Sequence, residues 1–146
     1  MGNGELSGRE SRQVAVAAAT LGPWRTAATV GTVVGGAALA VEVFTLDWSL
    51  DILSFPVSLG LFVSFLVGTV GGRLRGGERR LRRWADAHPW QSVLPAAGAL
   101  WGLDTLVLWL LGDHSLLGAL FTALLPAAAL LAVAGVVGSV KAARKG

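Results

Sequence analysis

Four long apolar stretches constrain the fold of this chain more than any other feature. They cover residues 26–46, 52–72, 91–111 and 116–140, and inside them only Glu42 and Asp104 carry a formal charge. Each is close to the 20 or so residues that a helix needs to cross roughly 30 Å of hydrocarbon. Because lipid offers backbone groups no hydrogen-bond partners, a spanning segment must be helical. The sequence therefore predicts an all-α, polytopic membrane protein with four transmembrane helices.

Composition supports this class and removes several kinds of chemistry. Of the 146 residues, 53% are hydrophobic and 14% are charged, against about a quarter charged in soluble domains. The chain has no cysteine and two histidines, which excludes disulfides, thiolate sites and histidine-rich metal centres. Phosphate-loop, zinc-protease and serine-hydrolase motifs are also absent from the sequence. We expect no enzyme activity, no cofactor and no metal site.

The basic residues predict the topology. All 12 Lys and Arg lie before the first span, between the second and third, or after the fourth, whereas the loops 47–51 and 112–115 contain none. Positive charge is retained in the cytoplasm, so both termini should be cytoplasmic in a cell-membrane protein. The two short loops predict antiparallel hairpins. The resulting segments are a cytoplasmic N-terminal segment (1–22), a first transmembrane hairpin (23–72), a basic cytoplasmic loop (73–88), a second hairpin (89–140) and a basic tail (141–146).

The two hairpins resemble each other in sequence. A shift of 66 residues aligns the Pro-Trp pair at 23–24 with that at 89–90, and the Asp-x-Ser-Leu turn at 47–50 with that at 113–116. Duplication explains both matches, although proline at a helix start and Asp or Ser at a turn also recur independently. A signal-peptide site at 38–40 is a rival interpretation of the first span, but cleavage there would remove half of the first repeat. We predict tandem hairpins that run in the same sense.

Small residues indicate where helices approach one another. Three spans contain a GxxxG pattern, which lets helix backbones pack closely in lipid. These patterns predict packing surfaces within the chain or, for one of them, an interface with another copy or a partner. The glycines concerned are Gly31, Gly35, Gly68, Gly72, Gly98 and Gly102.

The two intramembrane acids are candidates for cation or proton binding, because a charge in hydrocarbon is costly. Measured from residue 91, Asp104 lies roughly 20 Å into its span, and Glu42 lies roughly 24 Å into the first. No Lys or Arg lies in any span, so neither acid has a salt-bridge partner at that depth. Alternatively, Glu42 reaches the outer water, and Asp104 is structural and meets Trp101, Thr105 or a neighbouring helix.

The central loop is strongly basic. Residues 78–88 predict a short amphipathic helix whose arginines face water and contact anionic lipid at the cytoplasmic leaflet. The alternative is that the loop only fixes topology, and nucleic-acid binding is not expected. The arginines concerned are Arg73, Arg75, Arg79, Arg80, Arg82 and Arg83.

Two functions follow as expectations. The first is a non-enzymatic structural or accessory subunit that acts through helix contacts with itself, as a homo-oligomer, or with a larger membrane complex. The alternative is a small oligomeric transporter or channel, in which Asp104, alone or together with Glu42, binds a cation or a proton.

Overall fold

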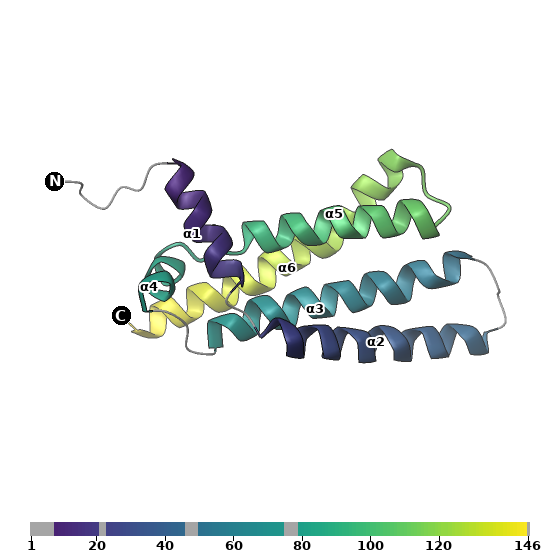
Figure 1. The fold of residues 1–146 in the computed structure, drawn as a ribbon, viewed down its shortest axis with the longest axis horizontal. Helices are drawn as coiled ribbons and strands as arrows, with labels where there is room; N and C mark the ends of the chain where they lie inside the picture. The colour runs from purple at the N-terminus through teal and green to yellow at the C-terminus, as the bar shows by residue number, and fades with distance from the viewer. Residues whose placement is uncertain (1–7, 21–22, 46–49, 75–78, 146) are drawn as a thin grey trace.

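The described part of the chain is entirely helical. The computed structural model describes residues 8–20, 23–45, 50–74 and 79–145. Four helices within these ranges are long and apolar enough to cross a membrane, which confirms the all-α class and the number of candidate spans. The elements in chain order are α1 (Gly8–Thr20), α2 (Trp24–Phe44), the 3-10 turn η1 (Leu50–Leu53), α3 (Ser54–Leu74), α4 (Arg79–Ala87), α5 (Leu94–Leu111) and α6 (Leu116–Lys145) (Figure 1).

The start of α5 differs from the sequence expectation. The apolar run begins at Gln91, but the helix begins at Leu94, after a turn in which the Ser92 hydroxyl donates to the Pro89 carbonyl at 2.9 Å. Pro95 then occupies the second position of the helix, where its missing N–H costs nothing. As a result Asp104 lies ten residues into α5, roughly 15 Å along it and near its middle.

The core lies between α3, α5 and α6. A cluster of buried residues from α5 and α6, including Leu100 and Leu130, packs against partly buried side chains of α3 such as Phe62 and Phe65. Much of this core is alanine, which lets α5 and α6 approach closely. The helix α2 packs along the other side of α3, so most of its surface stays open (Figure 1).

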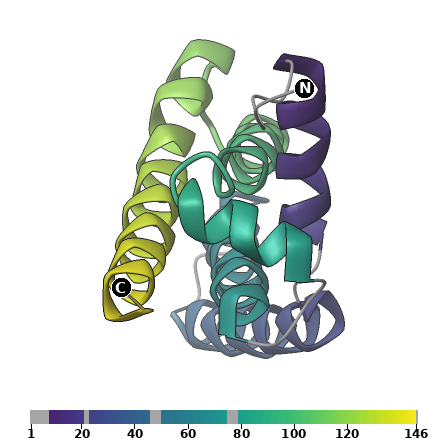
Figure 2. The ribbon, with the colours of Figure 1, turned by 90° about the vertical axis from the view of Figure 1, so that its left-hand side faces the viewer.

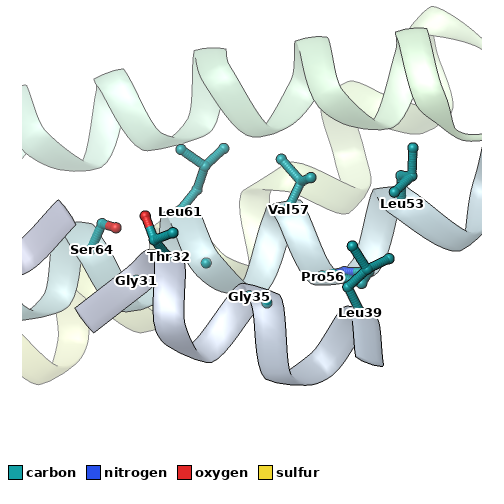
Figure 3. Close-up of a pocket in the computed structure, with 11 residues that line it drawn as sticks. Gly31, Thr32, Gly35, Leu39, Leu53, Pro56, Val57, Leu61 and Ser64 are labelled. Carbon is teal, nitrogen blue, oxygen red and sulfur yellow. The ribbon is translucent and has the colours of Figure 1, made fainter. Parts of the chain in front are cut away.

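Glycines make the contact between α2 and α3 close. Gly31 and Gly35 of α2 face Gly60 of α3 so tightly that an added Cβ at Gly31 would collide with the Gly60 carbonyl oxygen and the Ser64 side chain. Beside this contact lies a groove of about 360 Å³ (Figure 3). The absence of side chains at these positions, rather than any specific bond, brings the two helices together.

The tryptophans of the two Pro-Trp pairs both pack over glycines. The Trp24 ring covers Gly68 of α3, and its centroid lies 5.5 Å from that of Phe65 in an edge-on arrangement. The Trp90 ring covers Gly135 of α6 in the same manner. In each case an indole at the beginning of one long segment fills the space that a glycine leaves on the next.

One end of the bundle gathers the described basic residues. The short helices α1 and α4 and the C-terminal end of α6 lie together there (Figure 2), and the Lys145 ammonium donates to the Asp86 carboxylate at 2.6 Å. The helix α1 begins at Gly8 and ends at Thr20, within the N-terminal segment that the sequence analysis places before the first span. Asp51 and Asp113 lie at the opposite end.

Adjacent glycines of α2 give a matched test of the close contact. Gly31→Ala should lower the free energy of unfolding by about 1–3 kcal/mol, because the new methyl group has no room against α3. Gly36→Ala should be neutral or slightly stabilising, since nothing lies within 4 Å of its added Cβ and alanine favours helix. Thermal unfolding in mild detergent measures the stability of both variants. Equal effects of the two substitutions would contradict the close contact between α2 and α3.

Candidate functional site

A groove between α3, α5 and α6 holds Asp104. Its volume is about 690 Å³, and it contains the carboxyl group, three hydroxyl groups and three phenylalanine rings. Among the described residues that line it, Asp104 is the one with a formal charge. The lining side chains that matter for its chemistry are Ser54, Phe55, Ser58 and Phe62 from α3, Asp104 from α5, and Phe121, Thr122 and Pro126 from α6.

The Asp104 carboxyl group is buried, with no basic residue beside it in the groove and Ser58 as its interacting hydroxyl group. The residue is 1% exposed, and among the described groups neither carboxyl oxygen has a partner in good geometry. The Ser58 hydroxyl approaches from α3 and is the nearest polar side chain that interacts with it. Burying a charged group without an opposite charge costs free energy, so the position is not explained by stability.

Of the neighbours that the structural interpretation names for Asp104, Trp101 and Thr105 are engaged elsewhere, whereas the neighbouring helix α3 contributes Ser58, which interacts with the carboxyl group. The Trp101 indole N–H donates to the Leu120 carbonyl of α6 at 2.9 Å. The Thr105 hydroxyl donates to the Trp101 carbonyl at 2.7 Å. The Trp101 bond therefore joins α5 to α6, and the Thr105 bond lies within α5. Neither group donates to the carboxylate, which lines the groove.

Proline changes the backbone hydrogen bonding of α6 beside this groove. Pro126 lies inside α6 and has no N–H, so the Thr122 carbonyl four residues earlier lacks its usual helical donor. The Thr122 side chain lines the same groove. A carboxylate, hydroxyl groups and a released backbone carbonyl are the oxygen ligands that intramembrane cation sites use.

A polar stripe connects this site with one end of the bundle. Asp51 is exposed at the beginning of η1, and the Ser54 hydroxyl donates to its carbonyl at 2.7 Å and its carboxylate at 3.1 Å. Ser58 follows one turn later on the same face of α3 and reaches Asp104. On the other side of Asp104 the apolar core begins, with Leu100 and Leu130 fully buried.

Glu42 does not share this site. It lies two residues before the end of α2, half-buried, and its backbone carbonyl accepts a hydrogen bond from the Thr45 hydroxyl at 2.6 Å. The helix α2 packs on the face of α3 away from α5 (Figure 1). The structure therefore does not bring the two acids together.

The six glycines fall into different surroundings. Gly31 and Gly35 lie at the contact with α3, Gly68 lies under Trp24, and Gly72 is half-buried near the end of α3. Gly98 and Gly102 are exposed on α5, with no atom within 4 Å of an added Cβ. This last pair therefore has no packing partner within the described chain.

Four of the six arginines of the central loop lie on α4. Arg79, Arg80 and Arg83 are exposed, whereas the Arg82 Nε atom is buried and has no partner among the described residues. Arg73 lies in the last turn of α3, and Arg75 lies outside the described residues. Leu81, Trp84 and Ala85 form the half-buried face of α4, and Trp84 lines a groove of about 430 Å³ with Arg12 and Gln91.

The described residues contain no group of three His, Asp or Glu side chains that could hold a metal ion. The groove between α2 and α3 offers only the hydroxyl groups of Thr32 and Ser64 and no charge (Figure 3). Comparisons of the chain with protein-family models, curated proteins and solved structures find no match. The Asp104 groove is thus the candidate site on the strength of its own chemistry.

Sequence reasoning identified Asp104 but missed Ser54 and Ser58. A usable signal was present, because hydroxyl residues at positions 54 and 58 lie one turn apart on the second span.

Two substitutions distinguish a structural from a functional Asp104. Asp104→Leu should raise the thermal midpoint in detergent, because it removes a buried carboxyl group that has no basic residue beside it. Trp101→Phe should lower the stability by about 1 kcal/mol through loss of the bond to Leu120. If Asp104→Leu instead lowers the thermal midpoint as much as Trp101→Phe does, the carboxyl group supports the fold.

Proposed function

We propose that this chain is a small cell-membrane protein that binds a proton or a small cation at Asp104 and carries it across the membrane. The observation that carries the proposal is the buried carboxyl group in a groove that three hydroxyl groups also line and that no described basic residue lines. An intramembrane acid is expensive, and cation or proton binding gives its position a function. No enzymatic step is part of the proposal.

The surroundings of Asp104 support access from one side at a time. The stripe of Asp51, Ser54 and Ser58 supplies polar groups from the bundle end to the carboxylate. Toward the other end, the apolar cluster around Leu100 and Leu130 offers no polar group to an ion. Transport then requires a second arrangement of the helices in which this cluster separates.

The orientation follows from charge. The described basic residues lie at the end of the bundle that holds α1, α4 and the C-terminal end of α6 (Figure 2). Positively charged segments of membrane proteins stay in the cytoplasm. Both termini are then cytoplasmic, and the polar stripe opens to the outside. In this orientation Arg79, Arg80 and Arg83 of α4 lie at headgroup level and contact anionic lipid.

Tandem duplication accounts for the arrangement of the spans. The indoles of Trp24 and Trp90 occupy equivalent positions in the two proposed hairpins, and each covers a glycine of the following span. The two covered glycines do not align under the 66-residue shift, since Gly68 corresponds to Ala134 and Gly135 to Thr69, so these contacts add a general similarity to the sequence match and no exact equivalence.

A second candidate function is that of an accessory subunit or homo-oligomer held by helix contacts. Gly98 and Gly102 favour it, since they form an exposed small-residue face on α5 with nothing within 4 Å. A face of this kind admits another helix at close range. The two functions are compatible, because an oligomer can carry the Asp104 site in every copy.

Flux through proteoliposomes tests the transport proposal. Proteoliposomes with the wild-type protein should change their internal pH, reported by a trapped pH-sensitive dye, when a diffusion potential or a sodium gradient is imposed. Asp104→Asn should abolish this signal. Glu42→Gln is the matched control and should retain it, because Glu42 lies on the far side of α3. Absent flux for the wild type, or equal flux for Asp104→Asn, would overturn the proposal.

The oligomer interface has its own test. Gly98→Leu and Gly102→Leu should reduce crosslinked dimers several-fold without lowering the thermal midpoint, because neither position has a neighbour in the chain. Gly36→Leu, at an equally open position of α2, is the control and should leave dimers unchanged. If wild-type protein runs as a monomer and yields no crosslink in its membrane, helix contacts on this face are refuted.

A further inference from the structure

We infer that the groove beside Asp104 takes a lipophilic organic cation, whose charge pairs with the carboxylate while its apolar groups lie on Phe55, Phe62 and Phe121. This inference rests on the proposed function and names the class of substrate that the same site carries. It separates the site from one that serves a proton or an inorganic ion alone.

The size of the groove is the first observation. Its volume of about 690 Å³ falls within the roughly 300–1,000 Å³ typical of small-molecule sites. A proton or a dehydrated monovalent ion needs the carboxylate and a few oxygens, and leaves most of this space unused. The groove is therefore large enough for an organic molecule.

The charge determines the sign of the occupant. Asp104 is 1% exposed and lines the groove, and among the described residues the Ser58 hydroxyl is the group that interacts with its carboxyl group. No Lys or Arg lies within any span, so no group of this chain neutralises the carboxylate at this depth. An anion would be repelled by the carboxylate and a neutral molecule would leave its charge unbalanced, whereas a cation compensates that charge.

The remaining lining determines how apolar that cation is. Three phenylalanine rings surround the opening: Phe55 is 58% exposed, Phe121 is 73% exposed and Phe62 is half-buried. Aromatic rings attract cations through their faces and bury apolar substituents. A lipid acyl chain fits the rings but not the carboxylate, and a hydrated inorganic ion fits the carboxylate but not the rings.

Binding of tetraphenylphosphonium to the full chain in detergent is the direct test, measured by equilibrium dialysis with labelled ligand. Wild-type protein should bind it saturably, and Asp104→Asn should weaken binding by about tenfold or more, as for loss of a charged partner. Phe121→Ala should weaken it several-fold. Tetramethylammonium, which has the same charge and little apolar surface, should bind at least about tenfold more weakly than tetraphenylphosphonium.

Two control variants match these changes. Glu42→Gln removes an acid from α2, and Phe44→Ala removes a ring that is 85% exposed at the end of the same helix. Both should bind tetraphenylphosphonium as the wild type does. The thermal midpoint of each variant, measured in parallel, shows that any loss of binding occurs in a folded protein.

Three outcomes would overturn the inference. Equal binding by wild type and Asp104→Asn would mean that the ligand only partitions into an apolar surface. Equal affinity for the two cations would mean that the rings take no part. Absence of saturable binding, together with proton or sodium flux that Asp104→Asn abolishes, would refute the organic substrate and leave the proposed function intact; absence of both signals would refute both.

Discussion

Hydrocarbon provides no partner for a polar group, and this constraint shapes both the fold and the site. It requires each long apolar segment to satisfy its backbone internally, which only a helix or a closed barrel does. Four segments of the chain accordingly form helices long enough to span a bilayer. The same constraint makes the few polar groups within these helices conspicuous, because each must find a partner in protein, water or ligand. Trp101 finds one in the Leu120 carbonyl, whereas Asp104 has the Ser58 hydroxyl as its interacting group and no basic residue beside it in the groove.

Helix association in this setting depends on shape more than on the hydrophobic effect, because lipid is as apolar as the helices themselves. The buried positions of α5 and α6 are largely alanine, and α2 meets α3 through glycine. Large apolar residues instead stay on the outside, as Phe44, Leu125 and Phe121 illustrate. The pattern is the reverse of a water-soluble protein, where large side chains fill the core.

Length and composition sufficed to predict the four helices, but not which faces meet. A helix that is apolar all round carries no amphipathic signal, so nothing in the sequence of α2 or α5 indicates that Glu42 and Asp104 lie on opposite sides of α3. For the same reason Ser58 could not be paired with Asp104 in advance. Helix starts depend on local turns: hydrogen bonds around Ser92 delay α5 to Leu94 and thereby move Asp104 toward the middle of its helix.

The placement of the site relative to the proposed repeats has a physical consequence. Asp104, Thr122 and Pro126 belong to the second half of the chain, whereas Ser54 and Ser58 belong to the first. Under the 66-residue shift the position equivalent to Asp104 is Ala38, so the acid is present in one half alone and the hydroxyl groups of the other half face it. Any movement of α3 relative to α5 and α6 changes the distance between the carboxylate and those hydroxyl groups. A site built across two bodies in this way couples occupancy to their relative position, which is the property that alternating access requires.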